Sequence, residues 1–148
     1  MEFYEDVEVG TVVEHGATTM TRADIVSFAT EFDPQPIHVD ETAAAESMFD
    51  GLIASGWHTA SVCMRLLVEG VLGSQAALGG SGLETLRWHE PVRPGDRISI
   101  EVELLEKSPD PGDDSRGRLR TAVRGYNQEG VKVISWVSRG LIARRSPV

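Results

Sequence analysis

The stretch that decides the fold is residues 51–72, GLIASGWHTASVCMRLLVEGVL. From Trp57 onward it contains no proline and only two charged residues, Arg65 and Glu69. Apolar residues occupy almost every side of the helix that this stretch predicts, and such a helix must be covered by other structure. The stretch is too short, and too often interrupted by polar residues and glycine, to span a membrane. We therefore expect a central helix that the rest of the chain buries.

The sequence after this helix changes to the two-residue alternation of strands. Residues 97–104 place Ile, Val and Leu on one face and Arg, Ser and Glu on the other. Residues 119–126 and 131–142 predict the last two strands, joined as a hairpin at 127–130. Residues 86–89 alternate in the same way. A buried helix followed by antiparallel strands predicts an α+β fold in which a sheet curls around the helix.

The residues before the central helix predict a strand within residues 3–20 and then an amphipathic helix. In residues 21–32 one helical face carries Ile25, Phe28, Ala29 and Phe32. Pro34 ends this helix, because the residue before a proline avoids helical angles. A stiff loop over residues 33–39 and a short helix over residues 41–48 follow.

Two polar stretches of the second half predict irregular structure. Residues 73–82 contain four glycines and little periodicity, so we expect a loop or a short broken helix. Residues 108–117 carry Pro, Gly, Asp and Ser without an apolar anchor. This second stretch predicts a surface loop that tolerates shortening.

The composition is that of a single soluble domain spanning residues 1–148, with 41% hydrophobic and 25% charged residues. Fourteen Lys and Arg against 23 Asp and Glu give a net charge of −9, which argues against a nucleic-acid partner. The acidic N-terminus lacks the features of a secretory signal. Cys63, the one cysteine of the sequence, lies in the apolar helix as a small buried residue. Together these features favour the cytoplasm and no membrane partner.

The side chains best suited to chemistry lie in FDPQPIHVD, residues 32–40. Asp33 and His38 are five residues apart across a loop stiffened by two prolines, so the carboxylate and the imidazole can share a water molecule. In the alternative interpretation Asp33 caps a helix and His38 is a hydrogen-bonded loop residue. A metal site is a further alternative, with four candidate ligands: His38, Asp40, His58 and His89.

Three stretches together resemble the MaoC-like hydratases, the family of (R)-specific enoyl-CoA hydratases. Residues 33–40, DPQPIHVD, are similar to the family motif D-x-N-P-[IL]-H, and residues 51–57 are similar to its entry into the central helix. Residues 86–96, LRWHEPVRPGD, resemble its F-x-x-P-V-x-x-G-D turn between strands. The resemblance implies a hot-dog fold, in which the sheet wraps the helix, and a homodimer with two sheets joined side by side.

By the same resemblance, the protein adds water to a 2-enoyl thioester, giving a 3-hydroxyacyl thioester, or removes it. His38 would be the base, and Asp33 its partner and the proton donor to C2. Gly56 would offer its backbone N–H to the developing oxyanion, since a helix N-terminus favours negative charge. The acid role requires a raised pKa of Asp33, which a pocket formed by Phe32, Ile37 and the central helix would provide. No metal or redox cofactor is required.

The departures from the family pattern bear on the substrate. Gln35 replaces the asparagine of the motif, and Ser55 stands where many members have histidine. The family's serine that supports the catalytic carboxylate has no clear counterpart, although Ser61 lies nearby. Four residues are candidates for the substrate pocket: Gln35, Ile37, Ser55 and Trp57.

Gly56 also has a purely structural interpretation, as a helix start where a side chain would clash. The phosphates of an acyl-CoA have four candidate partners: Arg65, Arg87, Arg93 and Arg97. The carrier of the acyl group, CoA or a carrier protein, stays open. Two other functions also stay open: a non-catalytic acyl-binding or partner subunit, and a hot-dog thioesterase.

Overall fold

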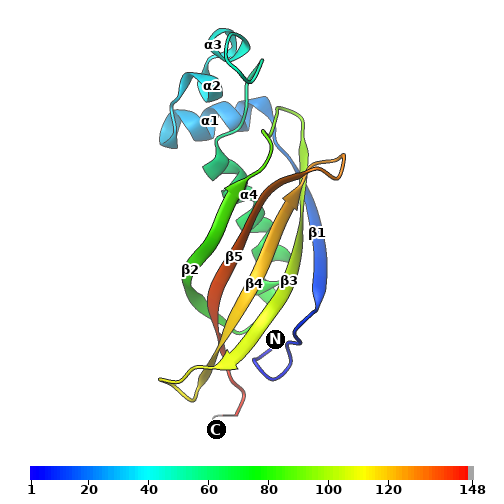
Figure 1. The fold of residues 1–148 in the computed structure, drawn as a ribbon, viewed down its shortest axis with the longest axis vertical. Coiled ribbons are helices and arrows are strands. Elements are labelled where there is room, and N and C mark those ends of the chain that lie inside the picture. The colour runs from blue at the N-terminus through cyan, green and yellow to red at the C-terminus, as the bar shows by residue number, and fades with distance from the viewer. Residues whose placement is uncertain (147–148) are drawn as a thin grey trace.

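In the computed structural model, which describes residues 1–146, five antiparallel strands curve around one long helix (Figure 1). The helix is α4, Gly56–Gly70. The strands are β1 Val12–Thr19, β2 Ala77–Trp88, β3 Arg97–Pro109, β4 Arg116–Tyr126 and β5 Lys132–Ala143. Their order in the sheet is β1-β3-β4-β5-β2, so β1 and β2 are the edge strands. The predicted α+β hot-dog arrangement is confirmed.

The core lies between α4 and the strands that face it. Side chains at helical spacing on α4, including Val62, Cys63 and Leu66, are buried against the sheet. Gly125 on β4 allows the helix to approach closely, because a Cβ there would lie 2.6 Å from Ile134 Cγ2 and 2.9 Å from Cys63 Sγ. Burial raises the pKa of the Cys63 thiol to about 12, so this cysteine is a packing residue.

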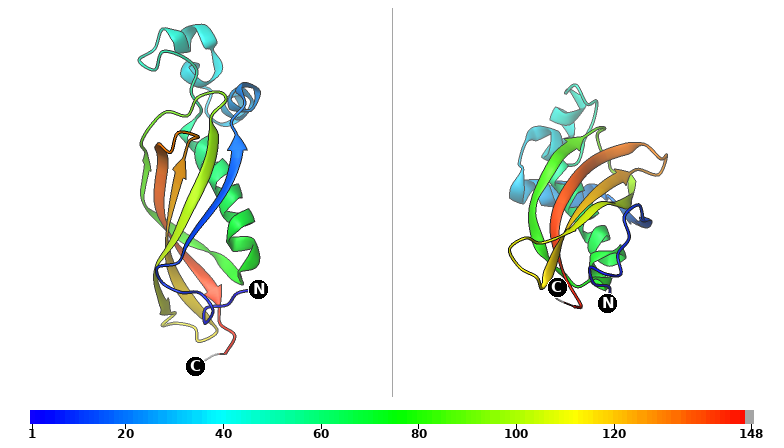
Figure 2. Two further views of the ribbon diagram at one scale, coloured as in Figure 1. Left: turned by 90° about the vertical axis from the view of Figure 1, so that its right-hand side faces the viewer. Right: turned by 60° about the horizontal axis from the view of Figure 1, so that its bottom comes forward.

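The sheet covers α4 from one side, as Figure 2 shows, and the opposite side of the helix stays exposed. Trp57, Met64 and Val68 expose 55%, 43% and 44% of their surfaces. The prediction of a helix covered on almost every side is therefore wrong for the single chain, because one curved sheet reaches only one side. This exposed apolar side is a feature that the function must explain.

The predicted strands of the second half are confirmed. Ile98, Ile100, Val102 and Leu104 on β3 are buried, while the residues between them are half-buried. The β4–β5 hairpin closes through Asn127, whose side-chain oxygen accepts hydrogen bonds from the N–H groups of Glu129 and Val131.

Two stretches that the sequence describes as irregular differ in the structure. Most of residues 73–82 belongs to β2, which begins at Ala77 after a 3-10 turn, η1, at Leu72–Ser74. Backbone pairing with β5 holds this glycine-rich part, with register shifts near Gly79 and Gly82. Because the partner strand lies more than fifty residues away, local periodicity does not predict it.

The polar stretch 108–117 is anchored, contrary to prediction. Asp110 is 5% exposed and pairs with the guanidinium groups of Arg116 and Arg118. Its carboxylate also accepts a 3.0 Å hydrogen bond from Gly112 N. The ring of Tyr4 fills the space above Gly117. A buried carboxylate with two arginine partners thus takes the place of an apolar anchor.

Three short helices lie together beyond the ends of the strands, opposite the two chain termini (Figure 1). They are α1 Arg22–Phe32, α2 Pro36–Val39 and α3 Glu41–Ala45. Thr21 caps α1 by accepting a 3.1 Å hydrogen bond from Asp24 N, and Asp40 caps α3 in the same way. Phe32, predicted on the buried face of α1, is 66% exposed because it ends the helix. The predicted loop 33–39 contains the single turn of α2.

Candidate active site

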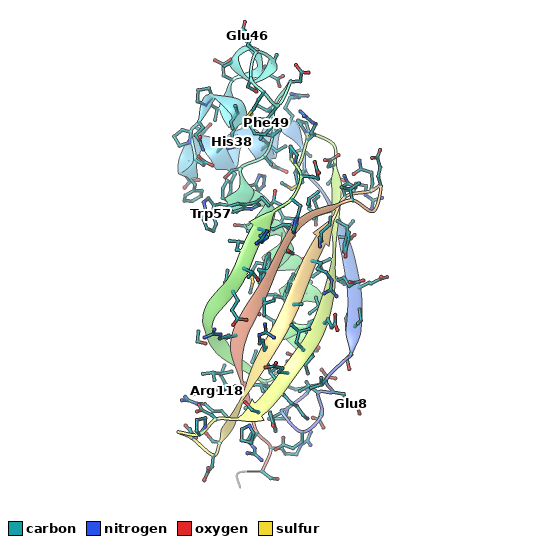
Figure 3. All side chains as sticks on the ribbon, viewed as in Figure 1. Glu8, His38, Glu46, Phe49, Trp57 and Arg118 are labelled. Atoms are coloured by element: carbon teal, nitrogen blue, oxygen red, sulfur yellow. The ribbon has the colours of Figure 1, made fainter. Side chains whose placement is uncertain are left out.

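Asp33 and His38 meet at the junction between α1 and α2. Asp33 is the C-cap of α1, and His38 lies in the turn of α2 that Pro36 begins. This turn brings Asp33 Oδ2 to 3.3 Å from His38 Nε2. The His38 side chain is 6% exposed and the Asp33 side chain 19%. In Figure 3, His38, Phe49 and Trp57 all lie at this end of the molecule.

The tautomer of His38 follows from its second partner. Its Nδ1 lies 2.8 Å from the carbonyl oxygen of Ile53, which can only accept a hydrogen bond. Nδ1 therefore carries a proton, and in the neutral imidazole Nε2 presents a lone pair. A carboxylate oxygen and an imidazole lone pair thus face each other, and both are hydrogen-bond acceptors. A hydrogen must lie between them, either as a shared proton or from one water molecule that donates to both.

Two side chains donate hydrogen bonds to the Asp33 carboxylate. Gln35 Nε2 lies 2.8 Å from Oδ1, and the Ser55 hydroxyl donates to Oδ2 over 2.7 Å. The donors at Gln35 and Ser55, in that order, hold the pKa of Asp33 below its usual value because they stabilise the ionised form. His38 adds a smaller effect of the same sign. Asp33 is therefore a carboxylate at rest.

This protonation state corrects the expectation that burial raises the pKa of Asp33. The two residues expected to desolvate it are not in place, because Phe32 is exposed and Ile37 does not line the site. The hydrogen bonds outweigh the limited burial of the carboxylate. An acid role for Asp33 is then possible only after it has received a proton during the reaction.

Gly56 is the first residue of α4, and Ser55 is its N-cap. The indole of Trp88 occupies the space that a Cβ at Gly56 would need, and Trp88 Nε1 donates a 2.8 Å hydrogen bond to Gly56 O. The predicted clash at this position is therefore confirmed. Within residues 1–146 the Gly56 N–H donates to no protein acceptor, as is usual for the first turn of a helix.

These groups open onto one cavity of about 430 Å³, large enough for a small molecule or part of a larger one. Asp33, His38 and Gly56 all line it, together with an aromatic wall. The remaining lining residues are Gln35, Phe49, Ile53, Ala54, Trp57, Thr59, Trp88, His89, Glu90, Pro91, Val92 and Val133. A second cavity of about 980 Å³ lies between α4 and the sheet, and Trp57 lines both.

Comparison with known proteins identifies a protein family for this chain and several similar proteins. The family model described as MaoC like domain matches residues 6–122. The chain belongs to the MaoC-like domain family. The crystal structure of a MaoC-like dehydratase from Rhodospirillum rubrum superimposes with a TM-score of 0.91 at 39% identity, covering 99% of both chains.

Two curated relatives of this chain carry enzyme names. A 3-hydroxybutyryl-CoA dehydratase of Methylorubrum extorquens is 36% identical over 113 residues, which are 73% of this chain and 67% of that protein. An (R)-specific enoyl-CoA hydratase of Rhodospirillum rubrum is 30% identical over 115 residues, 74% of each chain.

In this MaoC-like chain the serine beside the carboxylate is Ser55 rather than Ser61. The Ser61 hydroxyl donates to the carbonyl oxygen of Trp57 on the exposed side of α4. Ser55 lies 22 residues from Asp33 in sequence, so its contact with the carboxylate depends on the path of the chain. Its place immediately before the central helix, typical of an N-cap, is the sequence signal that could have drawn attention to it.

The other residues expected in the substrate pocket divide into two groups. Gln35 and Trp57 line the cavity, whereas Ile37 and Ser55 do not. Sequence reasoning missed Phe49, Thr59 and Trp88 as cavity residues. They come from three separate segments of the chain. Trp88 stands at the first position of the F-x-x-P-V-x-x-G-D pattern, which is the sequence signal that could have drawn attention to it.

The four candidate metal ligands each contact different groups. His38 faces Asp33, and Asp40 caps α3. His58 stacks on Phe28 with ring centroids 4.7 Å apart, and burial lowers its pKa. His89 Nε2 lies 2.7 Å from Ser135 Oγ. Among residues 1–146, no three His, Cys, Asp or Glu side chains are placed to hold a metal ion.

The four arginines considered for phosphate binding also lie apart. Arg93 donates a hydrogen bond to the carbonyl oxygen of Phe49 at the edge of the cavity. Arg65 lies on α4 near Glu69, 3.9 Å away. Arg87 and Arg97 are exposed on β2 and at the start of β3. A contact between any of these four arginines and an acyl carrier stays a prediction.

Proposed function

We propose that the protein is a hydratase or dehydratase of acyl thioesters, converting a 2-enoyl-CoA and a 3-hydroxyacyl-CoA into each other. The observation that carries the proposal is the convergence of three groups on one cavity: the Asp33 carboxylate, His38 Nε2 and the N-terminus of α4 at Gly56. The names of the two curated relatives support a CoA thioester as substrate.

In this proposal one water molecule donates its two hydrogens to His38 Nε2 and to Asp33 Oδ2. With both hydrogens held, a lone pair of its oxygen attacks C3 of the conjugated double bond. The negative charge moves to the thioester oxygen, where the Gly56 N–H and the dipole of α4 stabilise it. As the C3–O bond forms, one O–H bond of the water breaks and its proton passes to the carboxylate. Asp33 thus takes the proton in this proposal, whereas the family resemblance implies His38 as the base; His38 Nε2 orients the water by accepting its other hydrogen.

The second half of the reaction returns that proton to the substrate. Asp33, now protonated, gives the proton to C2 as the enolate collapses, and the site regains its resting charge. Asp33 thus serves as proton donor without a raised pKa at rest, because the proton that it delivers comes from the attacking water. Dehydration follows the same steps in reverse.

A thioesterase is the second candidate that the same groups could serve, because a water held by Asp33 and His38 could attack the thioester carbonyl instead of C3. A short 2-enoyl-CoA, such as crotonyl-CoA, separates the functions. Hydration removes the conjugated absorbance without releasing thiol, thioester hydrolysis releases free thiol, and a non-catalytic subunit does neither. We expect loss of absorbance without thiol release.

We further propose that two copies assemble through the exposed side of α4 and the edge strand β2. Leu78 and Leu83 on β2 are each 56% exposed, and β2 is an unpaired edge, which proteins usually cover. Gly82 has nothing within 4 Å of an added Cβ, so no contact within the chain requires glycine there. Bare backbone at an edge suits close approach by a second strand.

The cytoplasm remains the proposed location. Among the described residues, no helix has the length and apolar character needed to cross a membrane. The buried free thiol of Cys63 supports a reducing compartment.

A further inference from the structure

Thr59 lies in the first turn of α4 and lines the cavity that Asp33 and His38 also line. Its residue surface is only 2% exposed, so the side chain is enclosed. Thr59 follows Ser55 by four residues and Gly56 by three, and these spacings place residues on one face of a helix. The face of α4 that begins at the proposed oxyanion donor therefore continues at Thr59.

The hydroxyl of Thr59 makes no hydrogen bond within residues 1–146. A serine or threonine in a helix can donate to the carbonyl oxygen four residues earlier, as Ser61 donates to Trp57 O over 2.8 Å. For Thr59 that acceptor is Ser55 O, which already accepts from the backbone N–H groups of His58 and Thr59 over 3.0 and 3.1 Å. A carbonyl oxygen has two lone pairs, so the hydroxyl is left without a partner on its own helix.

The hydroxyl oxygen of Thr59 opens onto the cavity. Within residues 1–146, the fully enclosed side-chain nitrogen and oxygen atoms that lack a partner are His58 Nδ1 and Arg144 Nε. Thr59 Oγ1 also lacks a partner but is not among them, so it keeps contact with open space, and the space that this residue lines is the cavity. An unpaired hydroxyl in so enclosed a place costs free energy, and an acceptor on a bound ligand would remove that cost.

We propose that the Thr59 hydroxyl is a second donor to the thioester oxygen, beside the Gly56 N–H. The proposal rests on the proposed hydration reaction, in which this oxygen gains negative charge as water adds to C3. A hydrogen bond to the charged oxygen is stronger than one to the neutral carbonyl, so a second donor stabilises the transition state more than the bound substrate. Trp88 Nε1 and Gln35 Nε2, two other donors on the cavity wall, already have acceptors within the chain.

The first test compares the hydration of crotonyl-CoA by the wild type, Thr59→Val and Thr59→Ser. Valine has nearly the shape of threonine but no hydroxyl. Thr59→Val should lower kcat by roughly 10²-fold, the usual effect of removing one oxyanion donor, and should leave KM nearly unchanged. Thr59→Ser keeps a hydroxyl and should keep most of the wild-type kcat. A wild-type kcat in Thr59→Val, or a loss confined to KM, would overturn the proposal.

The melting temperature separates this role from a structural one. Thr59→Val should keep or raise it, because the lost hydroxyl has no partner within the chain, and a lower value would overturn the proposal. Thr30→Val is the matched control, since it removes an exposed hydroxyl that donates to Val26 O on α1 over 2.7 Å. This control should keep the wild-type kcat. An equal loss of kcat in both valine variants would also overturn the proposal.

A second readout does not depend on turnover. Butyryl-CoA has the thioester but no double bond to hydrate, and a hydrogen bond to its carbonyl oxygen lowers the infrared stretching frequency. With a ¹³C-labelled carbonyl, the frequency of the bound thioester should be lower in the wild type and Thr59→Ser than in Thr59→Val. Equal frequencies in all three, or no bound signal in the wild type, would overturn the proposal. A wild type that fails to hydrate crotonyl-CoA would refute the proposed function, while the frequencies would still decide whether Thr59 donates to the thioester.

Discussion

Trp88 explains why the proposed oxyanion donor, residue 56, is a glycine. Its indole takes the space of a side chain at position 56 and bonds to the carbonyl oxygen of Gly56. The first turn of α4 is thereby fixed against β2. Glycine at position 56 is needed for space, because its backbone angles are ordinary.

Gly56→Ala should lower kcat for hydration by about 10²-fold, because the added methyl must displace Trp88 or shift the helix turn, and small displacements of reacting groups have effects of this size. Steady-state kinetics with crotonyl-CoA measure it. Gly112→Ala is the control, since its added Cβ meets only ordinary contact, 3.7 Å from Asp110 Oδ1. Full activity of Gly56→Ala would contradict the predicted displacement, because the turn would then keep its N–H in place despite the added methyl.

At this scale the sequence predicted that Asp33 and His38 lie together, but not all of the contacts that hold Asp33. Asp33 and His38 lie within one short motif, and a single helical turn brings them together. The hydrogen bonds from Gln35 and then Ser55 lower the pKa of Asp33, and Ser55 reaches it from another element. Hydrogen bonds between distant segments leave no periodic pattern in the sequence.

Among the elements, the β3–β4 connection is held by charge where the sequence suggested a free loop. Asp110 is buried between Arg116 and Arg118, and the bonds to Gly112 N and Arg116 hold its pKa below the usual value. Removal of one member of such a group leaves buried charge without a partner.

Asp110→Asn should therefore lower the melting temperature at pH 7. Because the folded-state pKa is depressed, the stabilisation by Asp110 is complete above its unfolded-state pKa and is lost as pH falls through the folded-state value. The difference from wild type should shrink in acid. Asp114→Asn, the same charge change at an exposed neighbour, should alter the melting temperature little. Equal melting curves for Asp110→Asn and the wild type would contradict the anchoring role.

Elements with a strong hydrophobic periodicity of their own were predicted from the sequence. Elements defined by pairing with another strand were not. The alternation of β3 and the apolar spacing of α4 are local and were visible. The first half of β2 is glycine-rich and has no such pattern; its hydrogen bonds to β5 define it. Backbone pairing, unlike side-chain burial, is compatible with almost any sequence at an edge.

On the scale of the whole molecule, the exposed apolar side of α4 and the edge of β2 lie beside the second cavity. A single chain leaves these surfaces in water, which favours association with a second copy. Light scattering at micromolar concentration should give the mass of a dimer or a multiple of one, and a monomer would contradict the proposed assembly.

Leu83→Glu should shift that assembly toward the monomer, because it places a charge on the edge of β2. Val131→Glu is the matched control. Val131 is 39% exposed on the β4–β5 hairpin, outside the proposed interface. A dimer that survives Leu83→Glu unchanged would place the interface elsewhere.

The proposed reaction depends most directly on Asp33 and His38, and the decisive measurement is the hydration rate of crotonyl-CoA by Asp33→Asn and His38→Gln. Each variant should lose roughly 10²–10⁴-fold in kcat, the usual contribution of general acid–base catalysis, with thioester binding little weakened. The double variant should be barely slower than the slower single one, because both groups act on one water.

Glu31→Gln, an exposed carboxylate near the end of α1, is the control for the lost charge and should keep the wild-type rate. Circular dichroism should show that all four variants are folded. If Asp33→Asn hydrates crotonyl-CoA at close to the wild-type rate, Asp33 is a helix cap and the proposed mechanism is wrong.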